Sequence, residues 1–235
     1  IEPHVVEKAD VLTTNSDFFA EFGLRYNPHS YMVGQGCDVS HFSDEDDTIK
    51  VPNDFNDIPS PVIGYVGSLT TLRLDIKLLE HIANERKDWS IVLVGPEDED
   101  FKKSELHNLP NVYFLGRKDS SELPNYVKGF DVAMNPQLIN NLTIGNYPRK
   151  IDEYLAMGKP IIATNTKAME MFKDSVYLGS TKEQYIELIE KALIEDSKER
   201  AKDRINVAKS HTWTNNVEEI YNAIITATKQ KEKWD

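Results

Sequence analysis

The chain of 235 residues has a single cysteine, Cys37, which excludes an internal disulfide and favours a reducing compartment such as the cytoplasm. Cationic residues are also few: 27 Lys and Arg stand against 39 Asp and Glu, a net charge of −12. This balance argues against non-specific binding to nucleic acid, which needs a basic face. No apolar run approaches the roughly 20 residues of a membrane-spanning helix, and no signal peptide is visible.

Several chemical motifs are missing as well. The six histidines are scattered, without an H-E-x-x-H motif or a Cys/His cluster. There is no G-x-S-x-G nucleophile elbow and no G-x-x-x-x-G-K-[ST] phosphate loop. Two acidic runs, 44–47 and 97–100, contain carboxylates that suit Mg²⁺, but such runs usually form solvated loops. We therefore expect no metal site and no cofactor.

What the chain does have, from Pro61 onward, is a regular alternation of short apolar runs and helical patterns. Continuous apolar runs separated by helices are typical of a parallel sheet that is covered on both faces. The pattern predicts an α/β, Rossmann-like fold with six parallel strands, and a ligand site at the carboxyl ends of those strands. The expected strands are 61–67, 90–95, 111–116, 131–135, 159–164 and 176–178, and the expected helices between them are 74–86, 100–109, 123–129 and 148–158.

The two ends of the chain have a different organisation. Upstream, we expect short strands at 9–14 and 30–33 around a helix at 16–23, and then a linker over 44–61. Because the first residues already resemble the interior of a fold, we expect that an N-terminal part is missing. Downstream, the pattern predicts helices at 180–194, 198–209 and 213–229, followed by a polar tail that frays.

The segment 148–164 is the most informative stretch of the sequence. It is typical of a helix that is opened by Pro148, closed by Gly158 and followed at once by an apolar strand. The first turn of such a helix offers free amides, a positive dipole end and the cations Arg149 and Lys150, which together suit a diphosphate. Glu153 lies one turn later, where its carboxylate can accept hydrogen bonds from ribose hydroxyls. The alternative is an exposed ion pair between Lys150 and Glu153.

Glycines end three of the predicted strands, at Gly67, Gly95 and Gly116. Gly67, followed by Ser68, ends the first strand of the sheet, and Gly95 ends the second. Glycine at these places lets the backbone approach a phosphate or a sugar closely. A tight strand-to-helix turn explains the same residues without a ligand.

Two further cations follow strand ends. Arg73 stands near the start of the next predicted helix, where a cation opposes the helix dipole and an anionic ligand would relieve the cost. A nearby carboxylate, Asp75, is the competing partner. Gly116 ends the third strand and Arg117 follows it; they can frame a base, or they can form a solvated basic turn.

These features resemble family 4 of the GT-B glycosyltransferases. The stretch 62–67 with Arg73, Leu74 and Asp75 is similar to the opening of the family's C-terminal domain, and 148–164 is similar to its donor-binding signature. The resemblance extends over nearly the whole chain. The other matching stretches are 9–16 and 36–42, which resemble the end of the N-terminal domain and the hinge, and 110–116, 122–126 and 130–132.

The resemblance implies a glycosyltransferase of retaining, metal-independent type that acts in polysaccharide or glycoconjugate synthesis and uses a nucleotide-diphosphate sugar, with a UDP-sugar favoured over a GDP-sugar. It implies three parts: residues 1–50 from the acceptor side and hinge, 51–210 as the donor-binding domain, and 211–235 as a helix that packs back toward the N-terminal domain. The acceptor, a sugar or glycolipid, would bind to the missing domain, and the whole protein could associate peripherally with a membrane. The implied catalytic residues are Arg73 and Lys150, and the implied donor-binding residues are Gly67, Ser68, Arg73, Gly95, Gly116, Arg117, Tyr147, Arg149, Lys150 and Glu153.

The chain departs from the family pattern in two residues. Gly145 stands where the family often has a carboxylate, eight residues before Glu153, and Ser68 stands where it often has an arginine. These departures keep open the alternative of a non-catalytic subunit that binds a nucleotide sugar. A second alternative is a sugar-nucleotide epimerase, which shares the two-domain fold.

Overall fold

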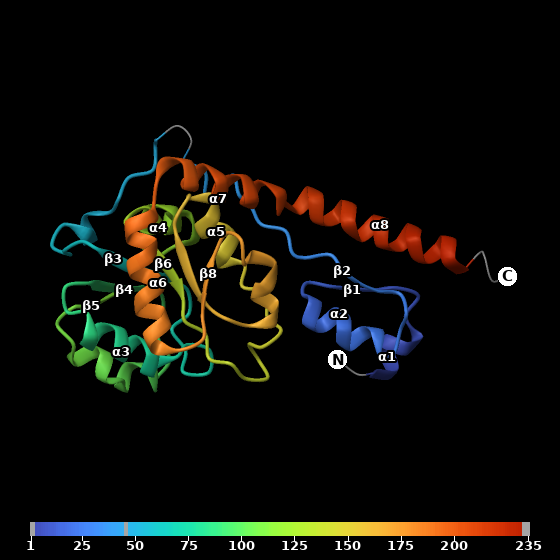
Figure 1. Cartoon of the computed structure of the whole chain (residues 1–235), viewed down its shortest axis with the longest axis horizontal. Helices are drawn as coiled ribbons and strands as arrows, with labels where there is room; N and C mark the ends of the chain where they lie inside the picture. The colour runs from blue at the N-terminus through green and yellow to red at the C-terminus, as the bar shows by residue number, and fades with distance from the viewer. Residues whose placement is uncertain (1–2, 45–46, 232–235) are drawn as a thin grey trace.

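Six parallel strands form the sheet of the larger part of the molecule (Figure 1). The computed structural model describes residues 3–44 and 47–231. The strand order is β5-β4-β3-β6-β7-β8, so the chain starts in the middle of the sheet, builds one half outward and then crosses over to build the other. This arrangement confirms the predicted α/β fold. The strands are β3 (Val62–Val66), β4 (Ser90–Val94), β5 (Val112–Gly116), β6 (Val132–Asn135), β7 (Ile161–Thr164) and β8 (Tyr177–Gly179).

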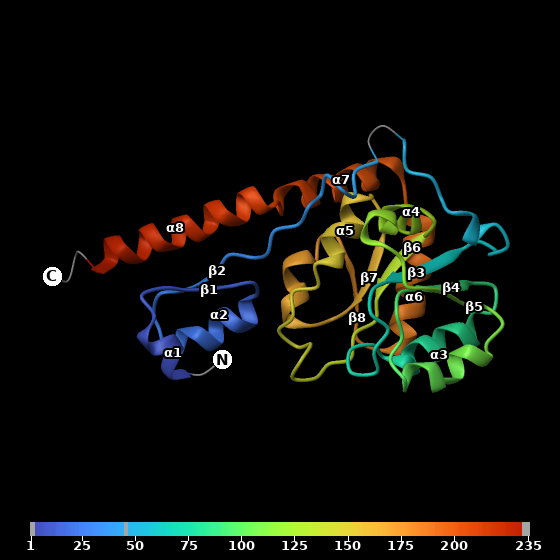
Figure 2. The ribbon, with the colours of Figure 1, turned by 180° about the vertical axis from the view of Figure 1, so that it is seen from behind.

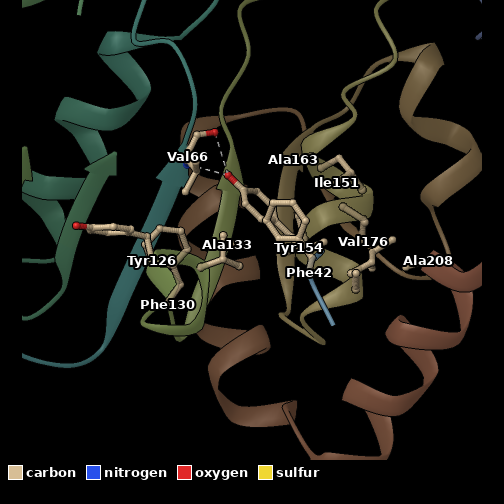
Figure 3. Close-up of a cluster of buried hydrophobic side chains, with 14 of the residues drawn as sticks. Phe42, Val66, Tyr126, Phe130, Ala133, Ile151, Tyr154, Ala163, Val176 and Ala208 are labelled. Carbon is tan, nitrogen blue, oxygen red and sulfur yellow. Dashed lines mark hydrogen bonds between the residues drawn. The ribbon is translucent and has the colours of Figure 1, made fainter. Parts of the chain in front are cut away.

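Helices cover both faces of this sheet, because successive side chains of a buried strand point to opposite sides. On one face Ile63 and Tyr65 of β3 pack with α3 (Ile76–Glu85) and α6 (Lys182–Glu195). On the other face Val62 and Val66 pack with α4 (Leu123–Lys128), α5 (Lys150–Ala156) and α7 (Lys198–Ser210). Figure 3 shows Tyr154 of α5 inside this second cluster, beside Val66 and Ile151.

Three local predictions are corrected by the structure. Leu74 lies outside the helix that it was expected to open, because Asp75 caps that helix by accepting a hydrogen bond from the Leu78 amide (2.9 Å). The helix expected over 100–109 is two short 3₁₀ turns, η2 (Phe101–Lys103) and η3 (Glu105–Asn108). The expected linker is packed rather than free, since its η1 turn (Asn53–Phe55) buries Phe55 against Tyr126 and Phe130.

A smaller part lies beside the sheet, and the chain connects the two at two crossings that lie side by side: the first at Cys37 and the second at His211 and Thr212. It contains α1 (Pro3–Lys8), which the sequence did not predict, and β1 (Leu12–Thr14), α2 (Asp17–Leu24) and β2 (Ser30–Met32), with β1 and β2 paired in parallel. The long helix α8 (Trp213–Lys231) runs back from the sheet toward this part, as Figures 1 and 2 show from opposite sides.

The contact of α8 with the smaller part is specific. The Asn216 amide donates a hydrogen bond to the Val33 carbonyl (2.8 Å), and Ala223 and Ala227 are buried. The predicted frayed tail begins within α8, and its residues 232–235 lie outside the described residues. In the part of the chain that the structure describes, no helix is both long and apolar enough to span a bilayer.

Candidate functional site

The backbone turns tightly where β3 and β4 end. Gly67 has φ = 144° and Gly95 has φ = 151°, which L side chains rarely adopt. A Cβ atom on Gly95 would lie 1.8 Å from the Gly67 carbonyl oxygen, so the two strand ends can meet only as glycines. The two predicted glycines therefore bring bare backbone together at the carboxyl edge of the sheet, where Gly67 is partly exposed and Gly95 is buried; we call these two residues the shelf.

Lys150 reaches this shelf from the first turn of α5. Its Nζ donates a hydrogen bond to the Tyr65 hydroxyl (2.9 Å) and lies 4.5 Å from the centre of the Tyr65 ring. The same Nζ is 3.2 Å from the position that a Cβ atom on Gly67 would take. The structure thus brings Gly67, Gly95 and Lys150 together at one edge.

Tyr154 anchors the helix that carries Lys150. Its hydroxyl oxygen accepts a hydrogen bond from the Val66 amide (2.8 Å), a contact that Figure 3 draws with dashed lines. The ring is fully buried, so the contact is shielded from water. Burial also raises the pKa of Tyr154 well above its ordinary value, which keeps the hydroxyl neutral.

Two backbone amides in the first turn of α5 are hydrogen-bonded, whereas the sequence predicted free amides. The Ile151 amide donates to the Pro148 carbonyl (2.8 Å), and the Asp152 amide donates to that of Arg149 (3.1 Å). These i to i−3 bonds tighten the start of a helix and satisfy donors that would otherwise be free. The expectation that this turn presents several free amides is therefore wrong for Ile151 and Asp152, and the positive charge at this place comes chiefly from side chains.

Glu153 pairs with Arg149, and the alternative pair with Lys150 is not formed. The Arg149 Nε lies 3.3 Å from a Glu153 carboxylate oxygen. The Glu153 side chain is 15% exposed, and its burial raises the pKa of the carboxyl even though Arg149 and Lys150 act in the opposite direction. Both residues line a pocket of about 170 Å³. Its other lining residues are Cys37, Asp38, His41, Phe42, Ser120, Leu123 and Trp213.

Tyr147 lies in the interior, where its hydroxyl is already engaged. It donates a hydrogen bond to one oxygen of the fully buried Asp152 carboxylate (2.6 Å), whose other oxygen lies 2.7 Å from His211 Nδ1. Burial, with Asp152 close by, raises the pKa of Tyr147. The sequence did not reveal this Tyr147–Asp152–His211 network, because its members come from a loop, a helix and a distant crossing.

The other predicted residues on this edge are more exposed. Arg73, Ser68 and Arg117 lie at the surface. No hydrogen bond or ion pair joins the Arg73 guanidinium to another described residue, and the competing partner Asp75 is engaged as a helix cap. Gly116 has φ = 69°, and a Cβ atom there would meet no atom within 4 Å.

Gly145, the position of the missing carboxylate, is closed by packing. A Cβ atom there would lie 2.4 Å from the Phe18 ring of α2, and its carbonyl accepts a hydrogen bond from Ser16 (2.8 Å). A carboxylate side chain does not fit at this place without moving Phe18.

Asn135 is a site candidate that the sequence did not single out. It ends β6, the strand beside β3, and it is 1% exposed. Neither its Nδ2 nor its Oδ1 has a hydrogen-bond partner among the described residues. Such an orphaned amide costs free energy unless a water or a ligand satisfies it.

The two acidic runs are engaged in local structure. The Asp98 carboxylate accepts hydrogen bonds from the Thr71 amide (2.8 Å) and the Phe101 amide (2.7 Å). Asp44 pairs with Lys128 (2.7 Å), while residues 45 and 46 lie outside the described residues. The described residues contain no cluster of three or more His, Cys, Asp or Glu that could hold a metal ion.

Comparison with known proteins gives matches of sequence and of structure. Residues 60–195 match a family model described as "Glycosyl transferases group 1". TuaH of Bacillus subtilis (strain 168), which its name assigns to teichuronic acid biosynthesis as a glycosyltransferase, is 32% identical over 159 residues. That match covers 65% of this chain and 40% of TuaH.

Solved structures share the fold at low sequence identity. The structure of Anabaena HepE in complex with UDP superposes with a TM-score of 0.74 at 16% identity, over 93% of this chain and 64% of that one. A glycosyltransferase from Rickettsia africae ESF-5 gives a TM-score of 0.75 at 16% identity, over 97% of this chain and 67% of that one. The chain therefore spans less than half of TuaH and about two thirds of these structures.

Proposed function

Because the chain belongs to the group 1 glycosyl transferases, a family of GT-B fold, we propose that it binds a nucleotide-diphosphate sugar, with a UDP-sugar favoured, at the carboxyl edge of its sheet. The observation that carries the proposal is the Lys150 ammonium, which lies beside the partly exposed Gly67. A diphosphate on this shelf meets a fixed cation and a backbone without side chains. Charged hydrogen bonds of this kind are about twice as strong as neutral ones.

Residues near the shelf would bind the nucleoside. Glu153 would accept hydrogen bonds from the ribose hydroxyls, and Gly116 with Arg117 would border the base. The pocket of about 170 Å³ beside Glu153 offers room on this side of the helix. The Arg73 guanidinium, which has no partner among the described residues, would form an ion pair with the diphosphate.

For the transfer step, we propose that the bond between the sugar's anomeric carbon and the β-phosphate oxygen breaks with retention of configuration and without a metal. Lys150 and Arg73 would stabilise the charge that develops on the departing diphosphate. The acceptor oxygen forms the new glycosidic bond to the anomeric carbon, and its proton passes to the departing diphosphate. We assign donor binding to residues 51–210, the end of the acceptor-side domain and the hinge to residues 1–50, and to 211–235 a helix that packs back toward the N-terminal domain, which would bind the acceptor.

The relatives support the choice of donor and the biological setting. HepE has been solved in complex with UDP and with UDP-glucose, and TuaH is named for the synthesis of a polymer. By this analogy we propose a role in polysaccharide or glycoconjugate synthesis, in the cytoplasm, with peripheral contact to a membrane where the acceptor is a glycolipid.

The proposal is tested by titration calorimetry with UDP, GDP and uridine. We expect UDP to bind more tightly than GDP. Lys150→Ala should weaken UDP binding about tenfold or more while uridine binding stays the same, since a hydrogen bond to a charged group contributes about 1.5–3 kcal/mol. Lys167→Ala is the matched control, because Lys167 pairs with Glu21 and is not among the proposed donor-binding residues. Heat from neither nucleotide would reject the proposal.

A second candidate function is a non-catalytic subunit that binds a nucleotide sugar. It is favoured by Gly145, where Phe18 occupies the space of a carboxylate that could reach the sugar. The test is an assay for release of UDP from UDP-glucose by the complete protein in the presence of acceptor. Tight binding without release of UDP would favour the subunit.

A further inference from the structure

Tyr65 links the two faces of the sheet at its carboxyl edge. Its ring belongs to the core on the α3 and α6 side, whereas Lys150 comes from α5 on the opposite side. The Lys150 side chain crosses the end of β3 and donates to the Tyr65 hydroxyl, which in turn lies 3.4 Å from the Ser68 carbonyl. The hydroxyl thus sits between the lysine and the shelf backbone.

This geometry explains the glycine at the end of β3. A Cβ atom on Gly67 would lie 2.9 Å from the Tyr65 hydroxyl and 3.2 Å from Lys150 Nζ. The hydroxyl, the ammonium and the bare backbone therefore form one compact unit. Tyr65 is only 2% exposed, so the packed core fixes its place.

The Lys150 ammonium is hydrogen-bonded to Tyr65, but no carboxylate of the described residues neutralises its charge. Among the described residues no carboxylate forms an ion pair with Lys150, and Glu153 pairs with Arg149 instead. A neutral phenol can accept one of the three N–H bonds of a lysine and can attract it through the ring face, while the full positive charge remains. The charge stays available to an anion on the shelf.

We propose that Tyr65 is a positioning residue for donor binding: it holds the Lys150 ammonium over Gly67, ready for the β-phosphate. The inference rests on the proposed function. A flexible lysine normally loses side-chain entropy when it is ordered by a ligand, and an ammonium that is already ordered avoids part of this loss. This matters more here because Ser68 stands where the family often has an arginine.

The test compares Tyr65→Phe with a matched control, Tyr177→Phe. The first variant keeps the ring and removes only the hydroxyl. Tyr177 on β8 also has a hydroxyl bonded to charged groups, Glu195 and Arg200, but it lies on the edge strand of the sheet, away from the shelf. Titration calorimetry measures UDP and uridine binding for each variant, and circular dichroism confirms that each is folded.

We expect Tyr65→Phe to weaken UDP binding about fivefold to tenfold and to leave uridine binding unchanged, because the lost bond acts through the diphosphate cation. Tyr177→Phe should change neither. In a Lys150→Ala background, Tyr65→Phe should add nothing further, since the residue through which it acts is gone. UDP binding that is unchanged in Tyr65→Phe, or losses that simply add in the double variant, would overturn the role of Tyr65.

Lys150→Arg gives a second measurement that does not depend on the tyrosine. It retains the charge but replaces a compact ammonium by a longer, planar group that cannot keep the same place. We expect a loss of UDP affinity of several-fold, and unchanged affinity would show that charge alone is sufficient. UDP binding by the wild-type chain tests the proposed function separately from all of these variants.

Discussion

The sheet part of the molecule, residues 60–210, and the crossing part, residues 3–43 and 211–231, bury their apolar side chains to very different degrees. In the sheet part, β3, β4 and β6 are buried along their whole length. In the crossing part, Trp213 is 51%, Tyr221 62% and Leu24 53% exposed. Exposed apolar side chains also occur in the sheet part, Ile194 (82%) and Leu72 (65%) among them, so the parts differ in their fully buried strands rather than in exposure alone. The comparison shows that the sheet part builds its own core, whereas the crossing part has little core of its own.

The two parts nevertheless meet at the candidate site. His211, at the second crossing, lies against Asp152 of α5, and its carbonyl accepts a hydrogen bond from the Cys37 amide of the first crossing (2.8 Å). The pocket beside Glu153 is lined from both parts. The crossings therefore form one wall of the pocket, while the shelf with Lys150 belongs to the sheet part alone.

The largest expected effect comes from a matched pair of truncations. Ile63→Ala removes a fully buried side chain in β3 and should lower the free energy of unfolding by about 2–5 kcal/mol, the usual cost of such a cavity. Ile225→Ala on α8, where the side chain is 48% exposed, should change it by about 0.5 kcal/mol or less. Urea unfolding measures both. Equal costs would show that the crossing part has a core of comparable importance.

A smaller effect is expected from pH at Glu153. Burial raises the pKa of this carboxyl above its ordinary 4.5, so the folded chain holds the proton more tightly than the unfolded chain. The wild type should therefore lose stability as the pH rises from 4.5 through the folded pKa, and Glu153→Gln should not show that loss. The difference in the free energy of unfolding, variant minus wild type, should therefore increase over this pH range. We expect this increase to be smaller than the loss of stability caused by Ile63→Ala.

Urea unfolding at several pH values between 4 and 8 gives this difference. A relative stability that is constant across the range would mean that the carboxylate is as well solvated in the folded chain as in the unfolded one. UDP should reduce the slope for the wild type, because ribose hydroxyls would satisfy the ionised carboxylate.

The last expected effect is on a reaction rate and not on stability, and it concerns Cys37, which reports on the first crossing. The thiol is 3% exposed, and its burial, with Asp152 and Glu153 nearby, raises its pKa to about 12. Since the thiolate is the reactive form, modification by a thiol reagent at pH 8 should be about a thousandfold slower in the folded chain than in urea. Equal rates would mean that the first crossing opens freely from α5, which would remove one wall of the pocket.

Much of the sheet part could be predicted from the sequence. The apolar run 90–95 predicted a strand that is buried on both faces of a covered parallel sheet, and β4 is such a strand. Gly158 was expected to end the helix before it, and it has the left-handed φ of 67° just after α5. The start of α5 was less predictable, because a run of local residues does not tell whether Ile151 and Asp152 will donate back along the turn.

The sequence by itself determined the six strands of the sheet and their order along the chain, the glycines at the strand ends and the cations that follow them, because these depend on local periodicity and on backbone freedom. Only the tertiary structure decided that Lys150 crosses β3 to Tyr65, that Glu153 pairs with Arg149, that Asp152 meets His211 and that Asn135 is left without a partner. These contacts join residues that are brought together by the packing of α5 and the crossings on the sheet, and no pattern along the chain encodes such distances.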